Sequence, residues 1–303
     1  MTVEDIRTHI TETSKDTNEE FKRLFHGRGG LYESWKHLTI DSIDSILSVA
    51  LYFKEAFEDE LMEMLVAFTK FSKYKTLVIQ RRYTKGTTSE VLVGELTENI
   101  YVVENGIKIK LNLLNNRNSG YFPDMKIGRE FIQKNAKDKR VLNLFSYTCA
   151  FSLAAKLGNA YEVVNVDMSK SALKTGMANH SLNAFNPRGT SFLSYNILKS
   201  FSSLKRKGPY DIIIIDPPSF QRGSFEVTKD YEKLIKRLEE LASEDCLVLA
   251  CLNSPELECD FIINMIEEFA PNFKFTQRLE NVKEFQSADE EKSLKNLVFQ
   301  RQS

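Results

Sequence analysis

One aspartate sits where a rigidly held carboxylate could act on a bound ligand. Asp216 ends the apolar run Asp211–Ile215, and Pro217 and Pro218 follow it directly. Two prolines cannot extend the hydrogen-bond ladder of a strand, and they stiffen the backbone where the strand ends. An ordinary loop seldom needs this arrangement, so the Asp-Pro-Pro unit favours a functional site at a sheet edge.

A second aspartate, Asp167, ends another apolar run at Val163–Val166. It follows an earlier strand–turn–helix transition by about 20 residues, the spacing at which an acidic residue accepts hydrogen bonds from the hydroxyls of a ribose. The alternative is an aspartate that, with Ser169, caps the next helix. The spacing favours ribose binding.

The turn that precedes Asp167 is polar and opens a helix. Asn143–Phe151 runs from a strand through a turn to a helix start, which presents backbone N–H groups to a polar ligand. It lacks the glycines of dinucleotide- and phosphate-binding loops, so a phosphate cradle of the usual kind is excluded. An ordinary strand–helix connection also fits this stretch taken alone.

Alternating strands and helices must position these residues. The strands expected after residue 139 are Arg140–Phe145, Glu162–Asp167, Thr190–Tyr195, Tyr210–Asp216, Cys246–Cys251, Phe273–Leu279 and Ser293–Arg301. Continuous β-branched runs are typical of parallel sheets covered on both faces. We therefore predict a doubly wound α/β domain, with its ligand at the carboxyl ends of the strands.

The N-terminal third has a different pattern. Residues 1–40 are polar and irregular, whereas Ile43–Phe71 carries apolar residues at three- and four-residue intervals and predicts a helix. Short strands are expected at Thr76–Tyr83, Glu90–Leu96, Asn99–Glu104 and Ile107–Leu113, and Asn105-Gly106 predicts a two-residue hairpin turn. We expect two domains: residues 1–115 as a helical region with a small β unit, a candidate for substrate recognition, and 116–303.

Composition narrows the class of protein. The 303 residues are 42% hydrophobic and 27% charged, with a net charge of −1, which excludes a globally basic nucleic-acid binder but not a local basic face. The start lacks a signal-peptide pattern and no apolar run reaches the length of a membrane span, so we expect a cytoplasmic protein without a membrane partner. Four cysteines without metal-ligand spacing predict reduced thiols and no metal site.

Two kinds of local feature stay open. Basic clusters, such as Lys70 with Lys73 and Lys75 or Arg81-Arg82, are either solubilising surface or phosphate contacts. The stretch His26-Gly27-Arg28-Gly29-Gly30 is either a substrate-side loop or a flexible turn, and the flexible turn is favoured.

From about Glu104 to Phe220 the chain resembles the bacterial ribosomal RNA large-subunit methyltransferases of class I, the group that includes the cytosine-C5 and guanine-N7 enzymes. The segments that carry the resemblance, in order, are Glu104–Lys108, Gly120–Asp124 with Arg129, Asn143–Thr148, Asp216–Phe220 and, near the end, Ser293–Phe299. The resemblance implies a seven-stranded Rossmann-like sheet and S-adenosylmethionine as cofactor.

The resemblance also implies a set of site residues. Asp167 would hold the ribose, Met168 would pack on the adenine, and Asn196 would contact the adenine edge. The full set of implied cofactor-binding residues is Asn143, Phe145, Ser146, Tyr147, Thr148, Asp167, Met168, Asn196, Asp216, Tyr121, Phe122 and Asp124, the last three as the 121–124 wall over the cofactor. Asp216, Pro217 and Pro218 would be catalytic, and Phe220 and Arg129 would lie on the substrate side.

Three departures from the family pattern bear on mechanism. Cys149-Ala150 stands where the family often has two glycines, and Asn196 replaces an acidic residue. Cys251 falls one residue before the place of the thiol that attacks C6 in the cytosine-C5 enzymes, and a one-residue shift on a strand turns a side chain to the other face. A buried small hydrophobe is therefore the favoured interpretation of Cys251 over a nucleophile.

The expected function is methyl transfer from S-adenosylmethionine to an RNA base, with ribosomal RNA as the expected substrate. Without a thiolate, transfer to a base nitrogen proceeds by positioning and desolvation, with Asp216 or backbone carbonyls orienting the amine. The alternatives are a protein or small-molecule methyltransferase on the same scaffold, and a degenerate, non-catalytic binding module. The sequence does not set the oligomeric state.

Overall fold

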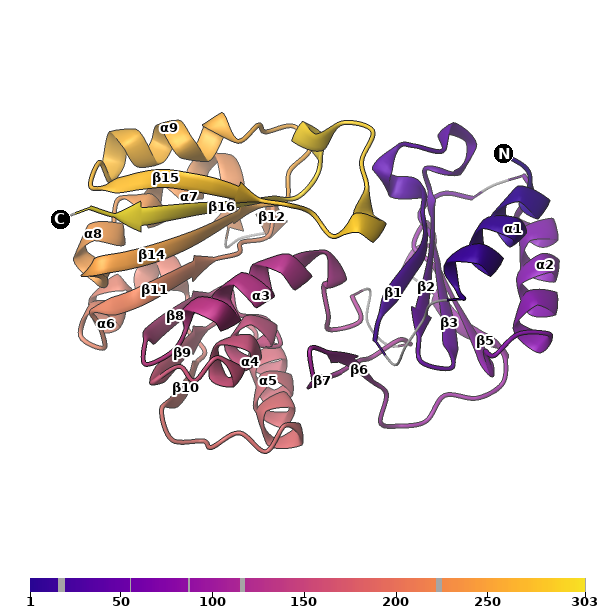
Figure 1. Ribbon diagram of the computed structural model, residues 1–303, viewed down its shortest axis with the longest axis horizontal. Helices are drawn as coiled ribbons and strands as arrows, with labels where there is room; N and C mark the ends of the chain where they lie inside the picture. Colours follow the sequence, from indigo (N-terminus) through magenta and orange to yellow (C-terminus); the bar gives the residue numbers. More distant parts are fainter. Residues whose placement is uncertain (16–19, 55, 87, 115–117, 222–224, 303) are drawn as a thin grey trace. The chain divides into compact units, whose positions relative to one another are not determined.

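A computed structural model describes residues 1–15, 20–54, 56–86, 88–114, 118–221 and 225–302. The chain divides into two units (Figure 1). One unit comprises Met1–Pro123 and Val282–Asp289, and the other comprises Asp124–Asn281 and Glu290–Ser303. The N-terminal unit therefore includes a short segment from near the end of the chain.

The larger unit is built on a seven-stranded sheet. Its strands are β8 (Arg140–Leu144), β9 (Glu162–Val166), β10 (Thr190–Leu193), β11 (Tyr210–Ile215), β14 (Ala242–Leu252), β15 (Phe273–Leu279) and β16 (Lys295–Arg301). Their order is β10-β9-β8-β11-β14-β16-β15, and β16 runs antiparallel to both of its neighbours. The predicted doubly wound, seven-stranded Rossmann-like sheet is confirmed.

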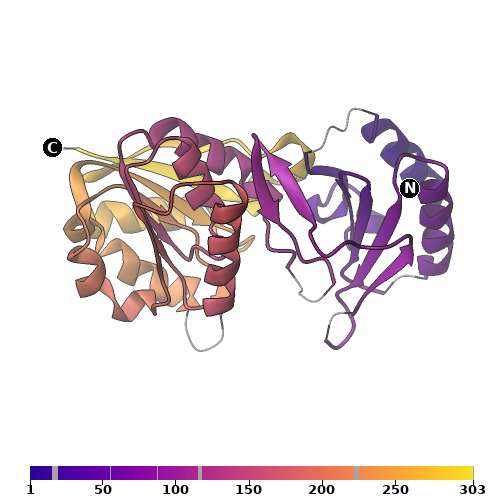
Figure 2. The ribbon, with the colours of Figure 1, turned by 90° about the horizontal axis from the view of Figure 1, so that it is seen from below.

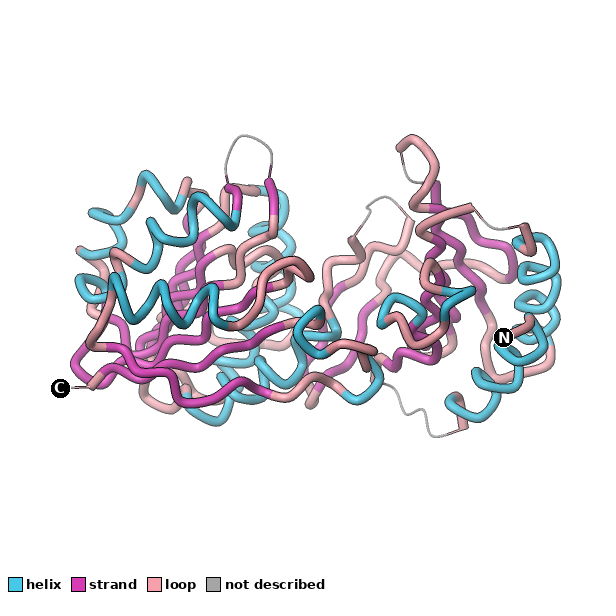
Figure 3. The backbone as a smooth tube through the Cα atoms, turned by 90° about the horizontal axis from the view of Figure 1, so that it is seen from above, coloured by secondary structure: helices cyan, strands magenta, loops and turns pink. Residues whose placement is uncertain are grey.

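Helices cover both faces of this sheet (Figure 3). The helices are α3 (Lys126–Asn135), α4 (Ala150–Leu157), α5 (Lys170–Leu182), α6 (Phe201–Lys205), α7 (Val227–Ile235), α8 (Leu238–Leu241) and α9 (Asp260–Phe269). One apolar core joins α6 to α9 with strand residues such as Ile213 and Ile215, and another joins α3 and α4 with Ile212 and Ile214. Alternate residues of β11 thus face opposite cores, which explains its uninterrupted apolar sequence.

The N-terminal unit contains a five-stranded sheet, ordered β1-β2-β3-β4-β5. The strands are β1 (Lys22–His26), β2 (Leu38–Ile43), β3 (Ile46–Leu51), β4 (Thr76–Arg81) and β5 (Thr88–Val93). Helices α1 (Val3–Thr13) and α2 (Glu58–Lys70) contact each other and share one apolar core with the sheet. Strands β3 and β4 are parallel, joined by α2, and the other neighbours are antiparallel.

Two expectations for this unit were wrong. Residues 1–40 are not irregular but contain α1, β1 and the start of β2, and the helix expected over Ile43–Phe71 is confined to α2. The first part of that stretch forms β3, in which buried Leu47, Val49 and Leu51 alternate with more exposed residues. A short apolar run satisfies a helical and a strand pattern equally well, and pairing with β2 and β4 selects the strand.

A hairpin completes the N-terminal unit (Figure 2). Strands β6 (Tyr101–Glu104) and β7 (Ile107–Lys110) pair through Asn105 and Gly106, which have φ angles of 49° and 81°. Two successive positive φ angles are the geometry of a type I′ turn, so the predicted hairpin is confirmed. A further short pair, β12 (Phe220–Gln221) with β13 (Phe225–Glu226), lies in the larger unit.

Over the part of the chain that the structure describes, no helix combines the length and the apolar character that crossing a membrane requires. The same residues include no group of three or more His, Cys, Asp or Glu side chains placed to hold a metal ion.

Candidate active site

The strand order of the larger sheet reverses between β8 and β11. In a doubly wound sheet, the crevice outside the carboxyl ends of the strands at this reversal is the usual ligand site. Leu144 of β8 is in register with Ile215 of β11 on one side and with Val166 of β9 on the other. Residues that directly follow these strands, Phe145, Asp167 and Asp216, therefore gather at one edge of the sheet.

The loop after β8 has an unusual backbone. Phe145, Tyr147 and Cys149 have φ angles of 57°, 47° and 65°, a region that costs energy for residues other than glycine. The loop closes on itself through a 2.7 Å hydrogen bond from Cys149 N to Ser146 O, and Ser146 N donates to Val166 O at 3.0 Å. Surrounding contacts hold this strained conformation at the edge of the sheet.

Asp167 fixes the same loop to the next strand–helix turn. One carboxylate oxygen accepts from Tyr147 N at 2.9 Å, and the other accepts from Ser169 N at 2.7 Å. Each carboxylate oxygen can accept a second hydrogen bond. The helix-cap interpretation belongs instead to Ser169, whose hydroxyl accepts from Ala172 N at the start of α5. Asp167 thus keeps acceptor capacity for a ligand.

Helix α5 makes room for the cysteine of this loop. A Cβ atom on Gly176 would lie 2.4 Å from the Cys149 sulfur, so glycine at this position accommodates the thiol. Asn179, one turn further along, donates to Thr148 O at 3.1 Å. The Cys149 side chain therefore packs against α5, and burial raises the pKa of its thiol to about 12.

A chain of buried polar side chains supports the loop from beneath. Asn143 donates to Asn165 at 2.9 Å, Asn165 donates to the Ser152 hydroxyl at 3.0 Å, and that hydroxyl lies 3.0 Å from His180 Nε2. Burial, together with Lys156, lowers the pKa of His180 to about 4, so this histidine is neutral. The Asn143 side chain is committed to this network. Sequence reasoning missed the other three residues, and their signal was a polar residue at a buried strand or helix position.

Asp216 occupies a different electrostatic setting. Burial raises its pKa to about 7, the carboxylate of Asp124 adds to the rise, and Arg129 opposes it. Pro217 is buried and Pro218 is exposed. Arg129, expected on the substrate side, is itself buried at the start of α3. The structure therefore brings Asp124, Arg129 and Asp216 into mutual electrostatic range.

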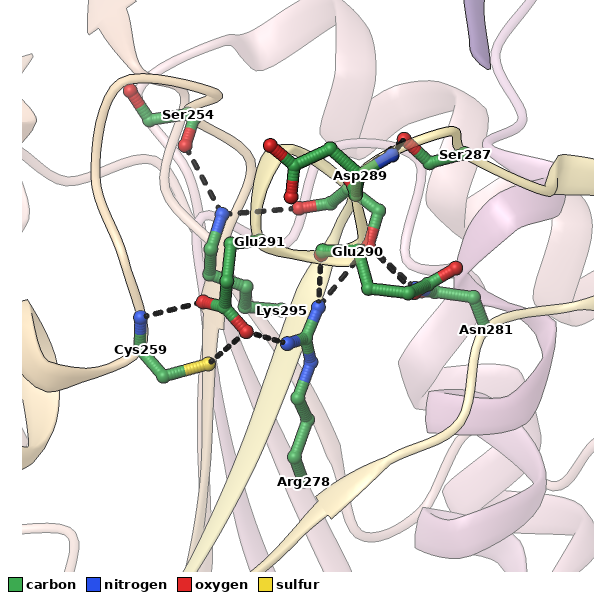
Figure 4. A network of polar contacts seen from close by, with 10 residues as sticks. Ser254, Cys259, Arg278, Asn281, Ser287, Asp289, Glu290, Glu291 and Lys295 are labelled. Atoms are coloured by element: carbon green, nitrogen blue, oxygen red, sulfur yellow. Dashed lines mark hydrogen bonds and ion pairs between the residues drawn. The ribbon is translucent and has the colours of Figure 1, made fainter. Parts of the chain in front are cut away.

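The loop after Asp216 is tied to the loop after β14. The Ser219 hydroxyl donates to the carbonyl of Asn253. The neighbouring carbonyl of Ser254 accepts from Lys295 Nζ at 3.2 Å, and the same ammonium donates to Ser293 O at 3.1 Å (Figure 4). Lys295 is fully buried at the start of β16. Three strand ends are thereby connected, and sequence reasoning assigned Lys295 no role.

Beside Lys295, Arg278 organises the chain that enters β16 (Figure 4). Its guanidinium donates to Glu291 at 2.6 Å and to the Ser293 hydroxyl at 3.1 Å. The Glu291 carboxylate in turn accepts from Cys259 N at 3.3 Å and holds its thiol at 4.0 Å. Cys259 is thus a partner in a structural network at the start of α9.

Several predicted site residues present accessible side chains at this edge. Met168 is 44% exposed and Phe220 is 66% exposed. Asn196 is half-buried at the end of β10, begins a short 3-10 helix (Ile197–Lys199), and its side chain makes no cap hydrogen bond. Phe145 is half-buried, and its ring lies 4.9 Å from that of Phe225, in an edge-on arrangement.

Cys251 lies inside the protein. It is 1% exposed and packs in the core that joins α3 and α4 to the sheet, whereas the next residue, Leu252, belongs to the core on the opposite face. Burial raises the pKa of the Cys251 thiol well above its ordinary value, and the carboxylates of Asp216 and Asp124 act in the same direction. All four cysteines are described, and the other three have raised pKa values too.

Two residues of the predicted 121–124 wall belong to the N-terminal unit. Tyr121 is buried there, and its hydroxyl donates to Glu104 at 2.5 Å. Phe122 is 39% exposed. Asp124 belongs to the larger unit, next to Asp216 in electrostatic terms.

Comparison with known proteins identifies relatives of the whole arrangement. The family model of S-adenosylmethionine-dependent methyltransferases matches residues 22–300. Ribosomal RNA large subunit methyltransferase I of Aeromonas salmonicida is 32% identical over 197 residues, which cover 63% of this chain and 50% of that protein. Methyltransferase K/L of Pseudoalteromonas translucida is 31% identical over 216 residues, 66% of this chain and 30% of that protein. The chain spans about half the length, or less, of these curated relatives.

Among solved structures, a putative methyltransferase named SMU.776, complexed with SAH, superimposes with a TM-score of 0.88 at 26% identity. The match covers 99% of this chain and 82% of that one. Both units of the present chain therefore have counterparts in a protein that binds the demethylated form of the cofactor.

Proposed function

We infer that this chain, which belongs to the S-adenosylmethionine-dependent methyltransferase family, transfers the cofactor's methyl group to a base of RNA. The observation that supports RNA as the methyl acceptor is the match to ribosomal RNA large subunit methyltransferases of two types, at 31–32% identity. Large-subunit ribosomal RNA is accordingly the acceptor that we propose.

The residues at the sheet edge fit the cofactor. S-adenosylmethionine supplies an electrophilic methyl group on a positively charged sulfur. Asp167, Asp124 and Asp216 offer carboxylates to a cationic nucleoside, and the absence of a glycine-rich turn between Asn143 and Phe151 suits a ligand without phosphates. We propose that Asp167 holds the ribose hydroxyls with its remaining lone pairs.

Other cofactor contacts are proposed by position. The backbone of Phe145, Ser146, Tyr147 and Thr148 would receive the methionine end, and the strained loop keeps that backbone in place. Exposed Met168 offers an apolar surface for the adenine, and the Asn196 amide can both donate to and accept from its edge.

Two further assignments concern Asn143 and the 121–124 wall. Asn143 would act through the loop it supports, because its amide is already hydrogen-bonded to Asn165. The role of Tyr121, Phe122 and Asp124 as the 121–124 wall stays a prediction from the resemblance.

We propose that the accepting atom is a base nitrogen. Methylation of cytosine C5 needs a thiolate that adds to C6, but burial holds every cysteine of the chain as a thiol. A nitrogen lone pair needs only alignment with the methyl group and removal of water. The carboxyl of Asp216, with a pKa near 7, can accept a hydrogen bond from an exocyclic amine and take up its proton.

The Asp-Pro-Pro turn and its neighbours complete the proposed acceptor site. Pro217 and Pro218 keep Asp216 at the strand end, and exposed Phe220 offers a ring on which a base can stack. Arg129 is buried, so we propose that it acts on the substrate side by compensating the charge of Asp216 and Asp124.

The test is methyl transfer from labelled S-adenosylmethionine to three acceptors: deproteinised large-subunit ribosomal RNA, protein extract and small metabolites. Label in RNA is expected, and nuclease digestion with mass spectrometry should find it on a base nitrogen. Label found only in protein or metabolites would reject the RNA acceptor. No label in any fraction, with cofactor binding intact, would support a non-catalytic binding module.

A further inference from the structure

The glycine-rich turn in the N-terminal unit is tightly packed. Gly27–Gly29 forms a 3-10 helix after β1. A Cβ on Gly27 would lie 1.8 Å from Trp35 O, and one on Gly29 would lie 1.9 Å from Gln286 O. Gly30 has a φ of 78°. Since no side chain fits at the first two positions, this turn packs closely against the backbone of Trp35 and Gln286.

This closely packed turn displays an arginine over an aromatic ring. The Arg28 guanidinium carbon lies 4.2 Å from the centroid of the Tyr52 ring, and that of Arg82 lies 4.9 Å from the same centroid. Arg82 also donates to the Tyr52 hydroxyl at 2.8 Å and to the carboxamide of buried Gln80 at 2.5 Å. Two cations from distant parts of the sequence thus share one ring.

The sheet topology brings these residues to a single edge. His26 at the end of β1 is in register with Thr39, and Leu38 at the start of β2 is in register with Leu51 at the end of β3. Leu51 is in turn in register with Arg81 at the end of β4. The residues that follow β1, β3 and β4 therefore converge, and they include Arg28, Tyr52, Lys54 and Arg82, which we call the Arg28–Arg82 edge.

Arg28 contributes an exposed positive charge to this edge. Arg28 is exposed, and within the described ranges no carboxylate lies at ion-pair distance from its guanidinium. Three carboxylates of this unit are engaged by other arginines: Glu58 and Glu90 pair with Arg81, and Asp41 pairs with Arg23 while also lying within electrostatic range of Arg82. The chain as a whole carries −1, so this concentration of cations is local.

Exposed aromatic rings accompany the cations. Phe53 and Phe57 follow β3 and are 69% and 59% exposed. Cations that meet phosphates, together with rings that stack on bases, are the combination with which proteins hold single-stranded nucleic acid. A protein partner would require a charge pattern of its own to match, whereas a polyanion with stacking bases matches both features.

We propose that the Arg28–Arg82 edge binds a single-stranded stretch of the RNA substrate, with Arg28, Lys54 and Arg82 on phosphates and the exposed ring of Phe53 available for stacking. This inference rests on the proposed RNA acceptor, and it assigns RNA contacts to a defined edge of the N-terminal sheet.

A second layer of contacts keeps the turn in place. His26 accepts from Arg23 at 2.7 Å, and its ring lies 5.2 Å from that of Phe285. Burial, together with Arg23 and Arg28, lowers the pKa of His26 to about 3, so it stays neutral at working pH. Positive charge at the edge therefore comes from the arginine and lysine side chains and does not vary with pH near neutrality.

The test measures affinity for a fluorescein-labelled single-stranded oligoribonucleotide over a series of KCl concentrations, using the full chain. Arg28→Gln and Arg82→Gln are expected to weaken binding several-fold and each to reduce the slope of log affinity on log salt by about 0.7. Phe53→Leu is expected to weaken binding without changing the slope, because it removes a stacking ring and no charge.

Lys70→Gln is the matched control. Lys70 is exposed at the end of α2, about 18 Å along the helix axis from Glu58, whose carboxylate binds Arg81 at the end of β4. Its loss should leave both affinity and salt slope unchanged. Calorimetric affinity for S-adenosylmethionine should be the same in all variants, which shows that they are folded.

Unchanged RNA affinity in Arg28→Gln, or an equal loss in Lys70→Gln, would overturn the proposed edge. So would a wild-type chain that binds no RNA. The two proposals can be tested separately. If the chain methylates RNA but its RNA affinity is unchanged in Arg28→Gln and Arg82→Gln, the proposed function is retained and the proposed edge is rejected.

Discussion

Asp167 illustrates how one side chain can serve the fold and the ligand together. Its two oxygens hold the backbone of Tyr147 and Ser169, which connects the loop after β8 to the turn before α5. The same oxygens retain lone pairs for the ribose that we propose. The effect of a substitution at this position on folding stability must therefore be measured separately from its effect on cofactor affinity.

We predict that Asp167→Ala weakens S-adenosylmethionine binding about 10- to 100-fold, because hydrogen bonds to a charged acceptor contribute about 1.5–3 kcal/mol. Asp167→Asn keeps one acceptor oxygen and should lose less. Isothermal calorimetry gives the affinities, and urea unfolding gives the stability of each variant. Affinity equal to wild type in Asp167→Ala would contradict the assignment.

Asp216 makes a prediction about pH. Its pKa near 7 means that the folded protein holds a proton there which the unfolded chain would release at lower pH. Folding stability from this group is therefore present at acidic pH and is lost as the pH rises through about 7. A bound sulfonium cation favours the ionised carboxylate, so cofactor binding should release the proton.

Affinity for S-adenosylmethionine should accordingly increase between about pH 6 and pH 8, whereas affinity for S-adenosylhomocysteine, whose sulfur is uncharged, should change less. Calorimetry of both ligands over this range measures the difference. In Asp216→Asn the two pH profiles should run parallel. A parallel pair in the wild-type protein would show that Asp216 does not meet the sulfonium.

At the scale of elements, α5 shapes the loop after β8. Gly176 gives space to the Cys149 sulfur, and Asn179 holds Thr148 O. His180, on the same side of the helix, closes the buried chain that begins at Asn143. Residues 176, 179 and 180 are spaced as one helical face, so a helix that reads as an ordinary connection acts as the support of the site.

We predict that Gly176→Ala destabilises the chain by about 1–3 kcal/mol, because the added methyl group overlaps the Cys149 sulfur. Cys149→Gly removes the sulfur and also relieves a φ of 65°. The double variant should therefore recover most of the lost stability. Urea unfolding of the single and double variants completes the cycle, and strictly additive losses would contradict direct contact.

At the scale of the molecule, the chain returns to its first unit near its end. Val282–Asp289 packs in the N-terminal unit, where the Phe285 ring lies 4.6 Å from the Arg23 guanidinium and Ala288 N donates to Gly29 O at 2.8 Å. The turn that carries Arg28 is thus stabilised by residues more than two hundred positions away in the sequence.

We predict that Phe285→Ala costs about 1–2 kcal/mol and loosens the N-terminal unit, because a half-buried ring and its cation contact are lost. Hydrogen exchange should increase at β1 and at Gly27–Gly30 but not at β8 or β11. Glu284→Ala, on the same segment, serves as the control. Equal protection at β1 in both variants would contradict this role for Phe285.

The architecture of the larger unit could be predicted from the sequence alone. Uninterrupted β-branched runs such as Ile212–Ile215 are typical of a parallel strand that is buried on both faces. The Asp-Pro-Pro unit then ends that strand, because proline cannot extend its hydrogen-bond ladder. The Asn105-Gly106 hairpin was equally plain, because few residues adopt two successive positive φ angles. Each of these features depends only on residues that are consecutive in the sequence.

Only the tertiary structure decided the rest. The pattern over Ile43–Phe71 fits a helix as well as a strand, and pairing between β2, β3 and β4 selects the strand for its first part. Three further features depend on residues far apart in sequence. They are the burial of Lys295, the packing of Cys149 against Gly176, and the position of Arg28 and Arg82 over the Tyr52 ring. Such contacts depend on how strands are ordered in a sheet, and that order cannot be read from the spacing of residues along the chain.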